Sequence, residues 1–239
     1  MGTSIDIFGL AVKNHQKNNL KEALNLYSQV LKIKPDHTGA LNNLGIIFKE
    51  LSENQKAKSC YEKAIRINPS YADAHNNLGI IFNELGENQK AKSCYEKAII
   101  INPSYADAHY NLGSTFEELG ENQKSKSCYE KAIVINPNYA DAHNNLGVIY
   151  YELGDYQKAK SCYEKAIEIN PIYASAYNNF GALYQELGQI QKAKSCYEKS
   201  IKIDPGFNAH NNLGLIYSEL GDFKKAISCY EKSIKINPN

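Results

Sequence analysis

The sequence predicts an all-α solenoid built from about seven helix–turn–helix repeats. The first observation is self-similarity, because the segment at residues 74–105 returns down the chain with few changes, at a period of 34 residues. A fixed period of 20–50 residues is typical of solenoids and related repeat architectures. The second is apolar residues at helical spacing within each copy. The third is a Gly after the first apolar stretch and a Pro after the second, both of which end helices.

The repeat register follows from a Leu-Gly pair (Phe-Gly once) in each copy. Six full repeats begin at Thr38, Ala72, Ala106, Ala140, Ala174 and Phe207, and the last spacing is 33 residues because one is lost beside Pro205. A seventh, diverged unit begins near Ser4. The predicted organisation is therefore a single array with repeats at about 4–37, 38–71, 72–105, 106–139, 140–173, 174–206 and 207–239. Positions below are counted from the first residue of each repeat.

The repeat from Ala72 shows the expected elements in order. Its first helix should run over residues 72–85 and stop at Gly86, and its second over 89–101, where Pro103 prevents continuation. Gly79 lies inside the first helix, at a cost of roughly 0.5–1 kcal/mol relative to Ala. Because a glycine recurs there in all six full repeats, we expect a neighbouring helix to approach too closely for a side chain. Each repeat then gains stability by burying its apolar face on the next.

Composition excludes several classes of function. The 27 Lys and Arg residues balance 26 Asp and Glu residues, whereas a dedicated nucleic-acid binder carries a basic excess. No apolar run approaches the ~18 residues of a membrane span, and the N-terminus lacks a signal-peptide pattern. We therefore expect a soluble, cytoplasmic protein in a reducing compartment, with no nucleic-acid or membrane partner.

These residues resemble the tetratricopeptide repeat (TPR) family over essentially the whole chain. In the repeat from Ala72 the eight signature positions carry His75, Leu78, Gly79, Phe82, Ala91, Tyr95, Ala98 and Pro103. The resemblance implies a right-handed superhelix whose first helices line a concave groove, with the second helices outside. It also implies a non-catalytic scaffold that binds a protein or peptide partner.

The resemblance places positions 2, 5, 6, 9, 12 and 13 on the inner surface, and position 6 is Asn in every full repeat. An amide side chain offers donors and an acceptor, which complement a peptide backbone. The pattern is similar to the groove of the superhelical domain of O-linked N-acetylglucosamine transferase, where an Asn row grips substrate backbones. A structural role for these side chains within the scaffold is the alternative. The predicted peptide-binding residues are Asn43, Asn77, Asn111, Asn145, Asn179, Asn212, Asp73, Asp107, Asp141, Tyr110 and Tyr151.

Charge on the inner surface indicates which partners fit. Positions 2, 5 and 6 of the full repeats contain no Lys or Arg, so the basic clamp with which some TPR proteins hold a C-terminal carboxylate is not expected. Glu occupies position 13 throughout, and Asp occupies position 2 in three repeats, which favours a basic or neutral peptide. Positions 9 and 12 vary between repeats, and specificity is expected there.

Two recurring residue types resemble chemical sites but fit packing roles better. All six cysteines occupy position 23, and equivalent sites in stacked helices lie about 10 Å apart, whereas a disulfide needs Cα atoms within about 7 Å. The histidines at position 4 do not share metal-ligand spacing on one helix. Phosphate-loop, metalloprotease and nucleophile-elbow motifs are absent. We therefore expect no enzyme activity, no cofactor and no metal.

Three functions are compatible with this reading. The first is a protein–protein interaction scaffold that holds an extended peptide segment in its groove. The second is a substrate-recruiting domain of a larger enzyme such as a glycosyltransferase, suggested because the sequence stops at Ile-Asn-Pro-Asn without the polar helix that shields an open end. The third is self-association through the uncapped C-terminal repeat, where Ile227, Tyr230, Ile234 and Ile236 are available.

Overall fold

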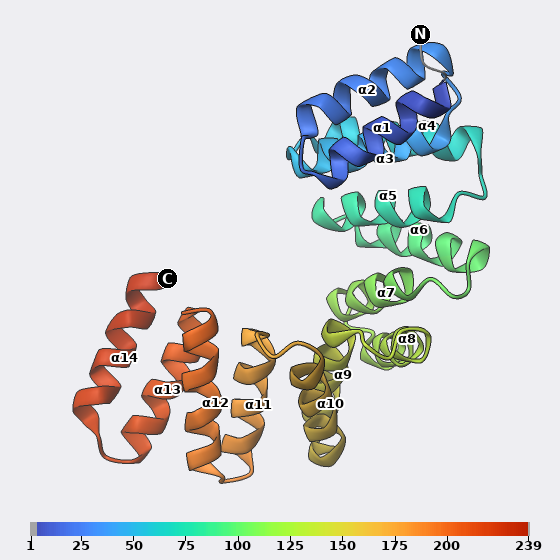
Figure 1. Cartoon of the computed structure of the whole chain (residues 1–239). Coiled ribbons are helices and arrows are strands. Elements are labelled where there is room, and N and C mark those ends of the chain that lie inside the picture. Colours follow the sequence, from blue (N-terminus) through green and yellow to red (C-terminus); the bar gives the residue numbers. More distant parts are fainter. Residues whose placement is uncertain (1–3, 239) are drawn as a thin grey trace. The chain divides into compact units, whose positions relative to one another are not determined.

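The computed structural model describes residues 4–238, and this part of the chain consists of α-helices joined by short turns (Figure 1). The helices are α1 (Ser4–Gln16), α2 (Leu20–Ile33), α3 (Thr38–Glu50), α4 (Asn54–Ile67), α5 (Ala72–Glu84), α6 (Asn88–Ile101), α7 (Ala106–Glu118), α8 (Asn122–Ile135), α9 (Ala140–Glu152), α10 (Tyr156–Ile169), α11 (Ala174–Glu186), α12 (Ile190–Ile203), α13 (Phe207–Glu219) and α14 (Phe223–Ile236). The fold is the predicted all-α helical repeat solenoid. The predicted helices 72–85 and 89–101 match α5 and α6 to within one residue.

The chain divides into two compact units, residues 1–128 and 129–239, with the boundary inside α8. In the first unit, α2 packs on α1 and α3, α4 on α3 and α5, and α6 on α5 and α7. In the second unit, α10 packs on α9 and α11, and α12 on α11 and α13. Each of these second helices therefore fills the space between the first helix of its own repeat and that of the next. That all repeats form a single array remains a prediction.

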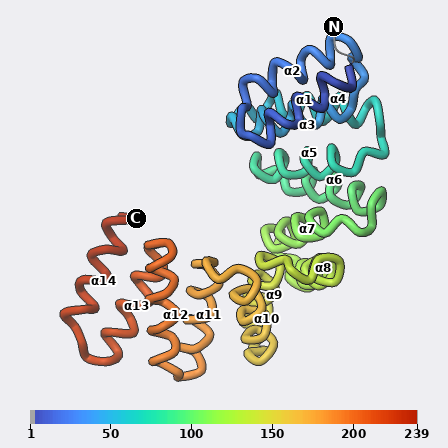
Figure 2. The backbone as a smooth tube through the Cα atoms, viewed as in Figure 1, coloured from blue at the N-terminus to red at the C-terminus, as the bar shows by residue number. Residues whose placement is uncertain are grey.

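The turn between the two helices of a repeat needs a residue in the left-handed region. Gly86 has φ +71°, and four other glycines at position 15 have φ between +68° and +74°. The tube in Figure 2 shows how short these turns are. A glycine adopts this conformation without steric cost, which confirms its predicted role at the helix end. Asn18 and Ser52 occupy the same position in the repeats from Ser4 and Thr38, with φ +57° and +59°, so the Ser52 turn carries a strain that the glycine turns avoid.

The core of each repeat is built around a tyrosine at position 24. Tyr95 on α6 is 2% exposed, and its ring lies against Gly79 of α5. A Cβ atom at Gly79 would stand 2.6 Å from Cε1 of Tyr95, closer than real atoms approach. The expected close contact at this glycine is therefore confirmed, and the group that makes it is a ring from the second helix of the same repeat.

Candidate functional site

The asparagines at position 6 lie on the first helices: α3, α5 and α7 in the first unit, and α9, α11 and α13 in the second. All six are half-buried. Positions 9 and 12 follow at intervals of three residues, which places them on the same side of a helix. We call the surface formed by positions 6, 9, 12 and 13 within one unit the first-helix face. Along it, positions 9 and 12 are half-buried apart from the exposed Leu215, and position 13 is exposed.

The position-6 asparagines are tied to the preceding repeat by hydrogen bonds. Asn77 donates its Nδ2 to Oδ1 of Asn42 at 3.0 Å, and Asn111 does the same to Asn76. The acceptor side chains Asn42 and Asn76, at position 5, are each 4% exposed. In the second unit the equivalent pairs are Asn179 with Asn144 and Asn212 with Asn178, both at 3.1 Å. Position 5 therefore lies between repeats in these pairs, rather than on the inner surface as the family resemblance implied.

Two position-6 asparagines donate a hydrogen bond to a tyrosine hydroxyl. Asn43 donates to Tyr27 at 3.1 Å, and Asn145 donates to Tyr129 at 3.3 Å. Both tyrosines occupy position 24, the signature position that Tyr95 fills in the repeat from Ala72. Their rings are buried, but their hydroxyls reach the asparagines of the first-helix face. For Asn43, the signal that could have revealed this is position 5 of the preceding repeat, which carries Phe8 in place of an amide.

The other predicted site residues are accessible. Asp73, Asp107 and Asp141 are exposed, and Tyr110 and Tyr151 are half-buried. Asp73 interacts with the hydroxyl of Tyr105, whose pKa is raised by burial first and then by the charge and hydrogen bond of Asp73. Position 2 therefore places exposed carboxylates at the start of α5, α7 and α9.

The glutamates at position 13 form a second set of contacts between repeats. Lys49 forms an ion pair with Glu84, with Nζ 3.1 Å from Oε1. Asn83 donates to Glu118 at 3.2 Å. Gln185 donates to Glu219 at 3.1 Å. In each case position 12 of one repeat approaches position 13 of the next, so the variable side chains of the first-helix face set the surroundings of these carboxylates.

A hollow of about 290 Å³ lies between the starts of α11 and α13. Its lining includes Asn178, Asn179, Ser175 and Asn208, together with the N-terminal residues of α13. It brings one predicted peptide-binding residue, Asn179, together with residues at position 2 of two repeats. The group offers hydroxyl and amide side chains to a polar ligand.

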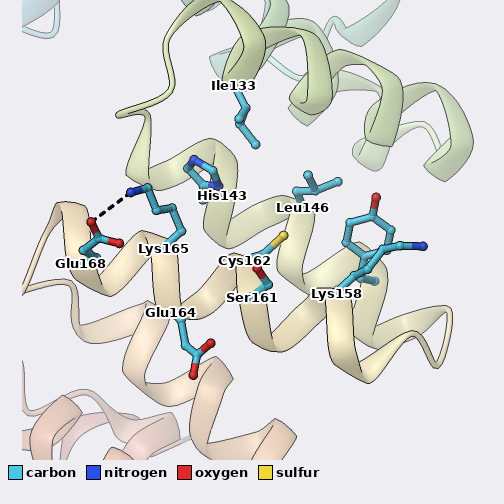
Figure 3. Close-up of a pocket in the computed structure, with 10 residues that line it drawn as sticks. Ile133, His143, Leu146, Lys158, Ser161, Cys162, Glu164, Lys165 and Glu168 are labelled. Atoms are coloured by element: carbon cyan, nitrogen blue, oxygen red, sulfur yellow. Dashed lines mark hydrogen bonds and ion pairs between the residues drawn. The ribbon is translucent and has the colours of Figure 1, made fainter.

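A larger pocket of about 500 Å³ lies elsewhere, against α9 and α10 (Figure 3). Its lining contains none of the predicted peptide-binding residues, and a second pocket of about 320 Å³ uses equivalent positions one repeat later. Lys165 at its edge is paired with Glu168 at 3.0 Å. Burial raises the pKa of the Cys162 thiol in this pocket to about 11. A thiol with this pKa is protonated at neutral pH and is a poor nucleophile.

The cysteines and histidines occupy packing positions. All six cysteines lie within the described residues, are not joined in disulfide bonds, and are buried or half-buried. His75 and His109 are each 5% exposed, and their Nε2 atoms lie 2.9 and 3.0 Å from the carbonyl oxygens of Pro69 and Pro103. Within residues 4–238, His, Cys, Asp and Glu side chains form no group suited to holding a metal ion. No helix in this part of the chain is both long enough and apolar enough to cross a membrane.

Comparison with protein families identifies the repeats. Models described as tetratricopeptide repeat match residues 104–171, 140–206 and 207–239, and one described as TPR repeat matches 46–86 and 81–120. Together these matches cover residues 46–239. None of the curated proteins compared with the chain matches it.

Solved structures show the same fold. MamA is 29% identical, with a TM-score of 0.59 over 67% of this chain and 94% of its own. The pilF protein of Pseudomonas aeruginosa is 21% identical, with a TM-score of 0.76 over 84% of this chain and 92% of its own. YrrB, a TPR protein with an unusual peptide-binding site, is 21% identical, with a TM-score of 0.61 over 86% of this chain and 97% of its own.

The repeat register, the helix pairs and these matches agree. TPR folds are typically non-catalytic and serve as protein-interaction scaffolds, and the accessible polar side chains of the first helices are consistent with that general role. The chain belongs to the tetratricopeptide repeat family.

Proposed function

We propose that the first-helix face binds an extended peptide segment and that the position-6 asparagines hold its backbone. The observation that carries this proposal is the orientation of these half-buried amides by hydrogen bonds of 3.0–3.1 Å between repeats. An amide side chain has two N–H donors and a carbonyl oxygen with two lone pairs. The bond to the preceding repeat uses one of the donors, so a structural role and a binding role are compatible.

Prior orientation of these side chains favours binding. A ligand that meets ordered side chains avoids part of the entropic cost of fixing them, about 0.5–1.5 kcal/mol for each flexible side chain. Neighbouring helices pack about 8–10 Å apart, and an extended chain rises about 3.3 Å per residue. If the amides of adjacent repeats are at least about 8–10 Å apart, as the packed helices are, consecutive asparagines would contact peptide residues about three or more positions apart. Contacts of this kind address the backbone and tolerate many side chains.

The charge on the face suggests the composition of the segment. The position-13 glutamates on the face are exposed, and so are the aspartates at position 2, at the starts of three of the same helices. At positions 6, 9, 12 and 13 of the full repeats, Lys49 is the one basic residue, and it is paired with Glu84. A basic or neutral segment therefore suits the face better than an acidic one. The existence of YrrB, a TPR protein with a peptide-binding site, supports the use of this fold for peptides.

A second candidate function is self-association through α14. Ile227 is 58% exposed and Ile234 is 62% exposed on this helix, and exposed apolar residues at helical spacing favour contact with another protein surface. Light scattering over a concentration series tests it: a rise in mass is expected, and a monomer at high concentration rejects it. That the array recruits substrates for a larger enzyme such as a glycosyltransferase remains a prediction.

A synthetic peptide array tests the peptide proposal. Random 12-residue peptides on a membrane are probed with the protein, and the strongest binders are remade in solution with single backbone N-methyl groups or single alanine substitutions. If asparagines hold the backbone, N-methylation at some positions should weaken binding at least as much as loss of a side chain. Binding that depends on side chains alone, or failure to bind any peptide, overturns the proposal.

A further inference from the structure

Two tyrosines distinguish one repeat from the others. Tyr151 occupies position 12 and Tyr156 occupies position 17 of the repeat from Ala140. The other full repeats carry Lys49, Asn83, Glu117, Gln185 and Ser218 at position 12, and Asn54, Asn88, Asn122, Ile190 and Phe223 at position 17. This is therefore the one full repeat with an aromatic residue at both positions.

The two side chains lie together beside a carboxylate. Tyr151 is near the end of α9 and Tyr156 begins α10, and their ring centroids are 5.8 Å apart with an interplanar angle of 42°. The hydroxyl of Tyr156 donates to Oε1 of Glu186, at position 13 of the next repeat, over 3.4 Å. Both rings are half-buried and Glu186 is exposed. A ligand on the first-helix face can therefore reach two aromatic rings and a carboxylate at one point.

The electrostatics of this cluster favour a cation. Burial raises the pKa of Tyr151, and the charge of Glu186 and the neighbouring Tyr156 raise it further, so the phenol is neutral at physiological pH. The nearby Lys158 is directed elsewhere, since its Nζ lies 2.6 Å from Asp155 and over the ring of Tyr150.

The repeats from Thr38 and Ala72 show how a cation is held between position 12 of one repeat and position 13 of the next. In the first unit, Lys49 at position 12 places its ammonium 3.1 Å from the position-13 carboxylate of Glu84. In the repeat from Ala140 the residue at position 12 is Tyr151, which offers an aromatic face and no charge. The position-13 carboxylate Glu186 thus lacks the position-12 ammonium that Glu84 has. A cation from a ligand can take the corresponding place and also lie against the rings.

We propose that Tyr151, Tyr156 and Glu186 form a recognition site for a cationic side chain, arginine or lysine, of the segment bound on the first-helix face. The proposal rests on the proposed function for the identity of the partner. It adds a specific requirement, which is a basic residue at the point where the segment crosses the repeat from Ala140. The position-6 amides would bind the peptide backbone whatever its side chains. The Tyr151–Tyr156–Glu186 cluster would determine which residue of the peptide lies at the repeat from Ala140.

Small probes test the cluster separately from the backbone contacts. The full chain with ¹³C-labelled tyrosine rings is titrated with N-acetyl-arginine amide and N-acetyl-lysine amide, and N-acetyl-citrulline amide serves as the neutral analogue of arginine. Ring signals of Tyr151 and Tyr156, assigned with the Tyr→Phe variants, should shift with the cations and far less with citrulline. Shifts of equal size with citrulline would overturn the proposal.

Variants separate recognition from folding. Glu186→Gln and Tyr151→Ala should each weaken binding of the arginine probe by about threefold or more, the order expected for one cation–π contact or one exposed ion pair. Tyr151→Phe keeps the ring and should keep most of the binding, and Ser218→Ala, at position 12 of another repeat, should leave it unchanged. Wild-type binding by Glu186→Gln contradicts the proposal.

Binding of peptides distinguishes failure of the cation-site proposal from failure of the proposed peptide-binding function. If peptides bind the first-helix face with no preference for a basic residue at any point, the backbone proposal stands and the cation site is rejected. If the probes bind at Tyr151 but no peptide binds, the cation site stands and the backbone proposal is rejected.

Discussion

Asn77 donates its Nδ2 to Oδ1 of Asn42, 35 residues earlier in the chain, at 3.0 Å. The donor is half-buried on the first-helix face, and the acceptor is 4% exposed between two repeats. The same pairing recurs between Asn111 and Asn76. One side chain therefore links neighbouring repeats and remains accessible at the surface on which a peptide is proposed to bind.

Removal of the buried acceptor should lower stability. In Asn76→Ala, Asn111 loses its partner but is half-buried and can turn to water. The expected loss is about 0.5–1.5 kcal/mol, the net worth of one hydrogen bond. Thermal unfolding followed by circular dichroism measures it against the surface control Gln89→Ala. Unchanged stability in Asn76→Ala would show that the hydrogen bond between repeats contributes nothing.

Two glycine-to-alanine changes should act in opposite directions. Gly79→Ala places a Cβ atom 2.6 Å from the ring of Tyr95, and overpacking of this kind costs about 1–3 kcal/mol, which exceeds the gain in helix propensity. Gly9→Ala, also inside a helix, meets no atom within 4 Å and should stabilise by about 0.5–1 kcal/mol. An unchanged or raised melting temperature of Gly79→Ala would contradict the tyrosine–glycine contact.

A change at the strained turn should stabilise the chain. Ser52 has φ +59°, where Gly86 and its equivalents are glycine. The left-handed conformation costs a residue with a Cβ atom about 1 kcal/mol, so Ser52→Gly should stabilise by somewhat less than that, because glycine also gains freedom in the unfolded chain. The reciprocal variant Gly86→Ser should destabilise. Equal stability of Ser52→Gly and the wild type would show that this turn is unstrained.

Alkaline pH should destabilise the fold. Burial raises the pKa of Cys60, Cys94, Cys162 and Cys196 to about 11. In the unfolded chain these thiols ionise near their ordinary pKa of about 8.5. Between these values the folded state holds more protons than the unfolded state, so its stability falls as pH rises. Urea unfolding between pH 7 and 10.5 checks this, and a rise in stability over that interval would contradict it.

The same pKa values predict slow thiol chemistry. At pH 8 a thiol with a pKa of about 11 has roughly 200-fold less thiolate than an ordinary cysteine. Reaction with a disulfide reagent should therefore be slow in the native protein and fast in denaturant. Cys60 and Cys162 are half-buried whereas the other four cysteines are buried, so the double variant Cys60→Ser, Cys162→Ser should remove the fastest native phase. Rapid reaction of all six native thiols would contradict their burial.

Much of the fold could be predicted because its determinants are local. The 34-residue period, the glycine at Gly86 and the proline at Pro103 define helix ends within a few residues of themselves. Even the contact at Gly79 was foreseeable, since a glycine inside a helix needs a reason. The family resemblance then supplied the expected inner positions.

The parts that sequence reasoning missed depend on contacts between repeats. Helical spacing cannot show that Asn42 is covered by the next repeat or that the hydroxyl of Tyr27 meets Asn43. Tyr151 was singled out because position 12 varies between repeats. Tyr156 is the first residue of α10, next to the turn, and no helical periodicity of apolar residues indicates a role for it. Its proximity to Tyr151 is a contact across the turn between α9 and α10, which helical spacing within one helix does not reveal.

The most direct test of the central claim compares two double variants in the first unit. Asn42→Ala with Asn76→Ala, and Asn77→Ala with Asn111→Ala, remove the same two hydrogen bonds, but the second pair also removes the accessible amides. Fluorescence anisotropy with a labelled peptide from the array measures affinity, and thermal unfolding measures stability. If the asparagines bind the peptide backbone on this face, both double variants should lose similar stability. The Asn77→Ala, Asn111→Ala variant should lose at least tenfold in affinity, clearly more than the Asn42→Ala, Asn76→Ala variant. Wild-type affinity in the Asn77→Ala, Asn111→Ala variant would contradict backbone binding.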